Sequence, residues 1–224
     1  MKEAYITAEN AVYTYKKGGF CVKCPALTLF RGEITVLRGR NGSGKTTLGK
    51  LLAGIEKPDP GRVLVAGRDT KKTSLGELGA LLGYVWQDVS LQFFAETVLD
   101  DMTFADVLMG RDRAASLEKA RAWLARFGLS ELENAPISRL SGGERARLAL
   151  AGTFMRKPAY LILDEPTANL DDKSVSALTA LLRELCDTEN VGMLIVSHDA
   201  EFIRAVGDRA LTMDNGEITD DDCI

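Results

Sequence analysis

The chain has 224 residues, enough for one large domain or for a core with a subdomain. A net charge of −4 and a pI near 5.2 argue against a broad nucleic-acid interface, because phosphate backbones need a basic stripe. No apolar run reaches the ~18 residues of a membrane span, and the first 15 residues hold no apolar signal segment, so we expect a cytoplasmic protein.

The first part of the chain predicts an antiparallel β region that leads into a central strand. Residues 5–15 alternate as a strand would, KKGG at 16–19 is typical of a turn, and residues 20–29 return as a second strand. Further along, the pattern predicts in order a strand over 34–37, a helix ending at Gly54, a turn over 56–61, a strand over 62–66, a weak helix over 75–82 and a strand over 84–86.

From residue 96 to residue 158 the sequence pattern has helical periodicity and contains no convincing strand. We predict helices over 96–110 and 112–128, a polar connector over 130–140 and a third helix after Ser141. This block indicates an all-helical subdomain inserted into an α/β core. The core then resumes with a strand over 160–163, a helix over 173–186, a strand over 191–196, a helix over 200–206 and a hairpin over 210–219 whose Asn215-Gly216 suits a tight turn.

The four cysteines are predicted to be free thiols. Cys21 and Cys24 form a CxxC, but they lie in a predicted strand, where residues three apart face opposite sides. No second CxxC or histidine pair completes a metal site.

The loop GRNGSGKT at residues 39–46 has the spacing of a phosphate-binding loop. Its glycines let backbone N–H groups wrap an anion, Lys45 brings positive charge to the outer phosphates, and the Thr46 hydroxyl can ligate Mg²⁺. The alternative is a glycine-rich turn that happens to hold a lysine. A strand before the loop and a helix after it favour the phosphate loop and predict a nucleoside triphosphate ligand.

An acidic pair, Asp164-Glu165, ends the apolar strand YLILDE. Downstream of a phosphate loop, this is the Walker B arrangement, in which Asp164 holds the Mg²⁺ shell and Glu165 positions the attacking water. Either acid alone has a plainer interpretation as a helix cap or a solvated strand end.

The segment LSGGE opens the third predicted helix. Ser141 as N-cap with Glu144 three residues on is a capping box, which is locally a sufficient explanation. Two glycines at a helix start are also typical of a second anion site. If Ser141 lies across the molecule from Lys45, the two sites are compatible when Ser141 serves the nucleotide of a second copy.

Taken together, these motifs resemble those of ABC-type ATPases, and the resemblance covers nearly the whole chain. The block LSGGERARLALAGTFMRKPAYLILDEPTANLD is similar to the family's signature-to-D-loop segment. The resemblance implies that Tyr15 stacks on adenine, Gln87 is the Q-loop glutamine, Asp171 belongs to the D-loop, and His198, the only histidine, senses the γ-phosphate.

The resemblance further implies a P-loop NTPase fold, with a RecA-like core and an antiparallel β subdomain (1–87 and 159–224) and an inserted helical subdomain (88–158). It implies a head-to-tail pair, in which each ATP lies between the loop of one subunit and LSGGE of the other. The implied catalytic residues are Lys45, Gln87, Glu165 and His198. The implied Mg²⁺ ligands are Thr46, Gln87 and Asp164. The implied nucleotide contacts are Tyr15, Asn41, Gly42, Ser43, Gly44, Lys45, Thr46 and Thr47, with Ser141, Gly142, Gly143 and Asp171 from the opposite subunit.

The stretch QDVSLQFFAETVLDDMTFA is similar to the energy-coupling-factor branch of these ATPases. In that branch a second glutamine, here Gln92, leads into a patterned helix on which Phe93, Thr97, Val98, Asp101 and Phe104 fall. Val89 departs from the pattern, where the family usually has proline. Many relatives carry a C-terminal extension that helps to hold the two ATPase subunits together, whereas this sequence stops at Ile224. The shorter form resembles ATPases of biotin, cobalt or nickel uptake systems. Without the extension, we expect the dimer to be weak when no nucleotide is bound.

The same stretch has an independent physical interpretation, because it holds more apolar surface than one small helix needs: Phe93, Phe94, Val98, Leu99, Met102 and Phe104. These residues form either the core of the subdomain, with Asp100 and Asp101 on a solvated face, or a groove for a basic coupling helix of a membrane subunit. In the family that helix carries an arginine, which an acidic rim would suit.

We therefore expect an ATP-hydrolysing subunit of an importer for a vitamin or a transition metal, held on the inner face of the cell membrane. A membrane coupling subunit docks near residues 87–104, and a substrate-binding membrane subunit is reached indirectly. One alternative is a soluble ABC ATPase of translation or DNA repair, but those usually have two cassettes or a long coiled-coil insertion. The other is the ATPase of an exporter or lipid-extraction complex, which the Gln92 helix disfavours.

Overall fold

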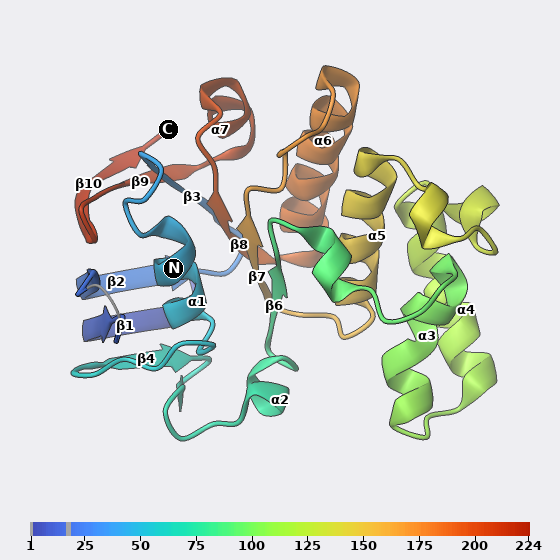
Figure 1. Cartoon of the computed structure of the whole chain (residues 1–224), viewed down its shortest axis with the longest axis horizontal. Coiled ribbons are helices and arrows are strands. Elements are labelled where there is room, and N and C mark those ends of the chain that lie inside the picture. The colour runs from blue at the N-terminus through green and yellow to red at the C-terminus, as the bar shows by residue number, and fades with distance from the viewer. Residues whose placement is uncertain (1, 17–18) are drawn as a thin grey trace.

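The computed structural model describes residues 2–16 and 19–224, so the predicted turn at 16–19 lies partly outside the described residues. One ten-stranded sheet runs through the molecule in the order β5-β4-β1-β2-β10-β9-β3-β8-β7-β6 (Figure 1). The strands are β1 (Ala4–Thr14), β2 (Cys21–Phe30), β3 (Ile34–Gly39), β4 (Arg62–Val65), β5 (Arg68–Asp69), β6 (Leu82–Val85), β7 (Tyr160–Asp164), β8 (Gly192–Val196), β9 (Arg209–Asp214) and β10 (Glu217–Cys223).

The helices pack on both faces of this sheet. They are α1 (Lys45–Leu52), α2 (Leu75–Leu78), α3 (Val98–Leu108), α4 (Arg113–Arg126), α5 (Gly142–Phe154), α6 (Asp172–Glu189) and α7 (Ala200–Val206), with short 3₁₀ turns η1 (Val89–Gln92), η2 (Ser130–Leu132) and η3 (Ile137–Arg139). In Figure 1, α3 and α4 form the end of the molecule furthest from β1 and β2. Among the described residues, none of these helices is long and apolar enough to cross a bilayer.

The parallel strands β3, β8, β7 and β6 lie side by side at one end of the sheet and are mostly buried on both faces. Their side chains alternate between two cores. Val36 and Ile195 face the core that α5, α6 and α7 share, whereas Leu37 and Leu194 face the core of α1 and the antiparallel strands. Because parallel strands end at one edge, this arrangement brings the residues that follow β3, β6, β7 and β8 to one side of the sheet.

The predicted α/β fold with a helical insertion is confirmed, with shifted ends at several elements. The helix predicted over 75–82 ends at Leu78, and the strand predicted over 84–86 begins earlier, at Leu82. The reason is tertiary: Leu82 pairs with Tyr160 and Val85 with Leu163, so the ladder with β7 sets the limits of β6. The helix predicted over 173–186 extends to Glu189, where Asn190 ends it in the left-handed conformation.

The block at 88–158 contains α3, α4 and α5 and no strand element in the part of the chain that the structure describes. Its last helix is not separate from the sheet. Leu148 and Leu150 of α5 belong to the same apolar core as Leu161 of β7 and Ile195 of β8. The division of the chain at residues 88 and 158 therefore stays a prediction, because one core spans both parts.

Cys21 and Cys24 lie on β2, the first half-buried and the second buried, and all four cysteines are free thiols. Burial raises the pKa of the Cys24 thiol to about 11, so this thiol stays protonated at neutral pH.

Candidate nucleotide-binding and hydrolysis site

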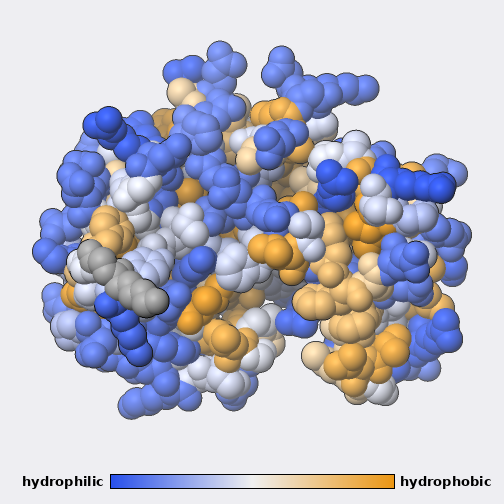
Figure 2. Space-filling view, in the orientation of Figure 1, coloured by the Kyte–Doolittle hydropathy of each residue, from blue (hydrophilic) through white to orange (hydrophobic). Residues whose placement is uncertain are grey.

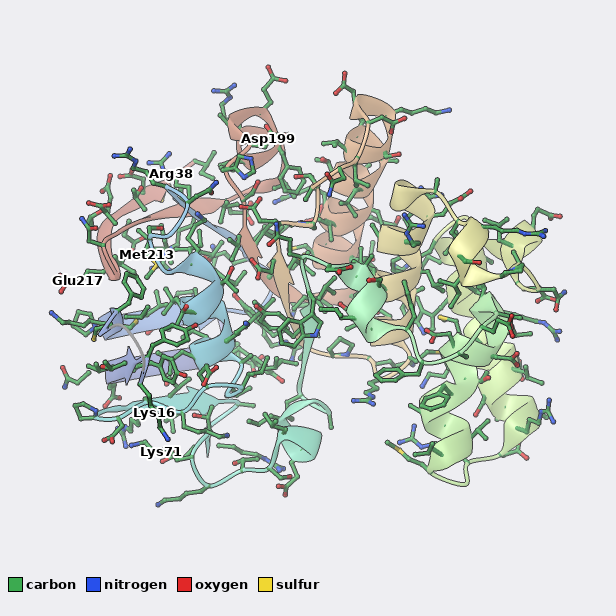
Figure 3. The ribbon with its side chains drawn as sticks, in the orientation of Figure 1. Lys16, Arg38, Lys71, Asp199, Met213 and Glu217 are labelled. Carbon is green, nitrogen blue, oxygen red and sulfur yellow. The ribbon has the colours of Figure 1, made fainter. Side chains whose placement is uncertain are left out.

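The glycine-rich loop connects β3 to α1 and is built on left-handed backbone. Gly39, Gly42 and Gly44 have φ angles of 151°, 81° and 104°. A Cβ atom at Gly39 would lie 2.2 Å from the carbonyl oxygen of Met213, so no other residue fits there (Figure 3 labels Met213). The hydroxyl of Ser43 is buried and has no partner among the described residues, which suits a loop that wraps an anion.

Lys45 is the charged end of this loop. Its Nζ donates hydrogen bonds to the carbonyl oxygens of Gly39, at 2.8 Å, and Arg40, at 3.0 Å, and the residue is only 6% exposed. These bonds hold the ammonium group over the loop at the N-terminus of α1, where the helix dipole adds to its positive charge. The arrangement favours a phosphate group at this point.

A cavity of about 510 Å³ opens beside the loop and gathers residues from separate parts of the sequence. Gln87 follows β6, Glu165 follows β7, and Val196 ends β8. The lining residues are Phe20, Asn41, Gly42, Gly44, Lys45, Thr46, Thr47, Gln87, Glu165 and Val196. The structure thus brings most of the implied phosphate contacts and three of the implied catalytic residues, Lys45, Gln87 and Glu165, into one polar cavity.

Oxygen atoms that suit Mg²⁺ lie next to this cavity. The hydroxyl of Thr46 donates to Oδ1 of Asp164 at 3.1 Å, and the hydroxyl of Tyr84 donates to Oδ2 at 3.4 Å. Burial is the main influence and raises the pKa of Asp164, while these two hydrogen bonds lower it. Mg²⁺ prefers oxygen ligands, so Thr46 and Asp164 fit the ion, and Gln87 lines the same cavity.

Glu165 and His198 form a pair at the ends of the adjacent strands β7 and β8. Nδ1 of His198 lies 3.0 Å from both carboxylate oxygens of Glu165. The Glu165 side chain is only 11% exposed, whereas the ring of His198 is 68% exposed. Glu165 has a φ of 49°, a left-handed conformation that costs free energy for a residue with a side chain, and its N–H donates to Val196. The fold thus holds this carboxylate at the cavity against a local backbone preference.

The predicted adenine contact, Tyr15, lies directly after β1 and is 37% exposed. Its hydroxyl is 3.0 Å from that of Thr47, and its ring meets Tyr13 edge-on. Tyr15 does not line the phosphate cavity, but Phe20 does, and the two are joined by a backbone hydrogen bond of 3.0 Å. Phe20 was not predicted as a site residue. The one indication of it in the sequence is that it lies across the predicted turn from Tyr15.

The signature segment forms the predicted capping box at the start of α5. The backbone N–H of Ser141 donates to Glu144 at 2.7 Å, and the backbone N–H of Glu144 donates to the Ser141 hydroxyl at 3.3 Å. The first of these bonds is the main cause that lowers the pKa of Glu144. Asp171 similarly caps α6 through the N–H of Ser174.

The structure does not bring this segment to the phosphate cavity of its own chain. None of Ser141, Gly142 and Gly143 lines that cavity. Gly142 instead lines a second cavity of about 630 Å³, which Gln87 and Glu165 also border. Within one chain, the two anion sites expected from the sequence are therefore distinct.

Comparison with known proteins agrees with this geometry. The family model described as "ABC transporter" matches residues 22–168. The chain is 38% identical to the putative ABC transporter ATP-binding protein PF0068 of Pyrococcus furiosus, over 95% of this chain and 81% of the relative. It is 33% identical to the energy-coupling factor transporter ATP-binding protein EcfA2 of Clostridium perfringens, over 97% and 77%.

Solved structures agree as well. The structure of cbiO1 from Clostridium perfringens, part of the ABC transporter complex cbiONQ, has a TM-score of 0.89 and 31% identity, over 98% of this chain and 88% of that one. The cassette MJ0796, solved as a dimer in a post-hydrolysis state with ADP and Pi, has a TM-score of 0.84 and 25% identity, over 97% and 98%. The chain belongs to the ABC transporter ATP-binding family and is an ABC ATPase.

Proposed function

We propose that this ABC ATPase is the ATP-hydrolysing subunit of an energy-coupling-factor-type importer for a vitamin or a transition metal. It acts on the inner face of the cell membrane. The observation that carries the proposal is an apolar groove beside the phosphate cavity, built by the segment after Gln87. The likeness to EcfA2 and to cbiO1 supports the type of transporter.

The groove has a volume of about 580 Å³ and lies between α3 and the sheet edge. We call it the docking groove, and its main apolar residues are Leu75, Leu78, Tyr84, Trp86, Leu91, Phe93, Phe94, Met102, Phe104, Leu108 and Met109. Phe94 and Leu108 are 71% and 74% exposed. Figure 2 shows hydrophobic surface gathered over the end formed by α3 and α4, next to a hollow. Contiguous exposed apolar surface of this kind is typical of a protein interface.

Side chains of the same segment fix the shape of the docking groove. Phe94 stacks on Phe104 with a centroid distance of 5.4 Å. Oε1 of Gln92 accepts a hydrogen bond of 2.7 Å from the N–H of Trp86. The second glutamine of the family pattern therefore ties η1 to the strand that leads into Gln87. This bond gives the groove a direct mechanical link to the phosphate cavity.

Asp101 has a structural role that the sequence did not predict. Its Oδ1 accepts hydrogen bonds from the N–H groups of Phe94, at 2.6 Å, and Ala95, at 3.1 Å. Burial raises the pKa of this carboxyl group, and the two bonds oppose that effect. Asp101 also lines the groove, so its proposed contact with an arginine of the coupling helix stays a prediction.

The proposed reaction uses the residues of the phosphate cavity as follows. Lys45 and the loop N–H groups bind the phosphates, and Thr46, Gln87 and Asp164 would hold Mg²⁺, which would supply positive charge against the transferred phosphoryl group. Glu165 orients the attacking water and accepts its proton, and His198, whose ring is paired with that carboxylate, senses the γ-phosphate.

Two copies are needed in this scheme. Ser141, Gly142 and Gly143 of the opposite subunit close the γ-phosphate side, and Asp171 of that subunit reaches the same interface. Closure on two ATP molecules and opening after hydrolysis then move the membrane subunits through the docking groove.

Purification of the tagged protein from cell membranes tests the proposal. We expect it to be recovered with a scaffold subunit and a substrate-binding subunit, both integral to the membrane, whose identity from mass spectrometry also indicates the cargo. Recovery with an exporter subunit would contradict the importer proposal. Recovery with ribosomes or DNA, and not with membranes, would contradict a transport function altogether.

A further inference from the structure

Tyr84 connects the docking groove to the proposed metal site through a single side chain. We propose that Tyr84 is a positioning residue for Mg²⁺-nucleotide binding: its hydroxyl holds Oδ2 of Asp164, so that Oδ1 faces Thr46 and the ion. The inference rests on the proposed Mg²⁺ site, and it gives a role to a residue outside the motifs of the phosphate cavity.

The first observation behind this proposal is the pair of hydrogen bonds that orient the Asp164 carboxylate. Its two carboxylate oxygens have different partners, Thr46 at Oδ1 (3.1 Å) and Tyr84 at Oδ2 (3.4 Å). Asp164 is 2% exposed, and among the described residues these hydroxyl groups are the only hydrogen-bond partners of its side chain. Two bonds to opposite oxygens fix the rotation of the carboxylate plane. Without the Tyr84 bond, only Thr46 would orient this group.

The second observation is the position of Tyr84, which lets its hydroxyl reach Asp164 from outside the phosphate cavity. The residue lies on β6, the neighbour of β7 in the sheet, and Tyr84 is paired with Ile162. Its hydroxyl end lies against α1, where a Cβ atom at Gly49 would be 3.6 Å from the phenol oxygen. The phenol thus reaches Asp164 through the space between the strand and the helix of the phosphate loop. A hydroxyl placed there acts on the ligand without occupying the phosphate cavity, which Tyr84 does not line.

The opposite end of the side chain belongs to the docking groove. The ring of Tyr84 contacts that of Trp86 with a centroid distance of 4.8 Å, and both rings line the groove. The Nζ atom of Lys50, on α1, lies 5.2 Å from the centre of the Trp86 ring. The aromatic pair therefore packs against the phosphate-loop helix as well as the groove. Phenylalanine at position 84 would keep this packing and remove only the hydroxyl.

The experiment measures ADP affinity by calorimetry in excess Mg²⁺ and again in EDTA, so that no nucleotide is hydrolysed. We expect Tyr84→Phe to lose about tenfold in affinity with Mg²⁺, as is usual when a partner of a metal ligand is removed, with unchanged affinity in EDTA. Tyr5→Phe is the matched control, because Tyr5 donates to the carbonyl oxygen of Leu81, away from the metal site. That variant should keep both affinities.

A double variant separates positioning from a general loss of structure. If Tyr84 acts through Asp164, adding Tyr84→Phe to Asp164→Asn should cause no further loss of Mg²⁺-dependent affinity. Equal losses with Mg²⁺ and in EDTA, or no loss with Mg²⁺, would overturn the inference. A wild-type protein whose ADP affinity does not respond to Mg²⁺ would instead contradict the proposed metal site itself.

Discussion

The phosphate cavity and the docking groove are of similar size, about 510 and 580 Å³, but they are built in opposite ways. The cavity takes six of its lining residues from one short segment, residues 41–47, and is polar and charged. The groove takes its lining from the segment just after α1, from β6 and η1, and from helices α2, α3 and α5, and it is mainly apolar. One short segment therefore supplies most of the cavity lining, whereas the groove is assembled from several segments spread over residues 53–158. The two regions adjoin where β6 leads into Gln87.

The largest expected effect comes from removing the acid of the cavity. Glu165→Gln keeps the size of the side chain but cannot accept a proton, so we expect ATP hydrolysis to fall by about 100-fold or more. ATP binding should remain, and the ATP-bound dimer should accumulate in light scattering. Glu118→Gln is the control, since Glu118 is exposed and lines neither the phosphate cavity nor the docking groove. A Glu165→Gln variant that stays monomeric under saturating ATP would rule out a site shared between two copies.

A charge placed in the docking groove should show whether binding to the membrane subunits depends on the groove. Phe94→Asp adds a carboxylate to the exposed ring that stacks on Phe104, and we expect at least about tenfold weaker binding to the membrane subunits. The measurement is recovery with membranes, with the melting temperature as a check of the fold. Ile224→Asp alters another exposed apolar residue, outside the groove, and should not affect docking. Wild-type recovery of Phe94→Asp would show that the groove is not the docking surface.

The smallest expected effect concerns two capping boxes with the same pattern of hydrogen bonds, one in the signature segment and the other beside the docking groove. Ser141 caps α5, and Ser74 caps α2, which borders the groove. Removing either hydroxyl with Ser141→Ala or Ser74→Ala should lower the free energy of unfolding by about 1 kcal/mol in urea titrations.

Only Ser141→Ala should also weaken ATP-driven dimerisation, because only Ser141 is proposed to meet a nucleotide. If Ser74→Ala weakens the dimer equally, the effect comes from stability, and the phosphate cavity is not half of a composite site.

Features fixed by neighbouring residues were predicted well from the sequence. The capping box at Ser141 depends on four consecutive residues, and the turn at Asn215-Gly216 depends on two, with φ angles of 44° and 86° in the structure. The phosphate loop is of the same kind. Each of these carries its geometry in residue type alone, as with the positive φ angles of Gly42 and Gly44 in the loop.

Contacts between distant parts of the sequence could not be predicted in this way. The bond from Tyr84 to Asp164 joins residues 80 apart, and no periodicity marks it. Phe20 reaches the cavity only because β2 lies beside the loop, where its ring would be 3.3 Å from a Cβ atom at Gly44. The limits of β6 were also misplaced, because its ladder with β7 decides them and the local pattern does not.

The order of strands in the sheet has a consequence for how the protein is made. The strand that leads into the phosphate loop, β3, pairs with β8 and β9, which lie more than 150 residues later. By contrast, β1 pairs with β2 across a short connection. During synthesis the antiparallel hairpin can form early, but the loop at residues 39–46 has no sheet neighbours until residues 192–214 have left the ribosome. The nascent chain therefore gains its nucleotide site only after residues 192–214 have been made, although the loop itself is made long before them.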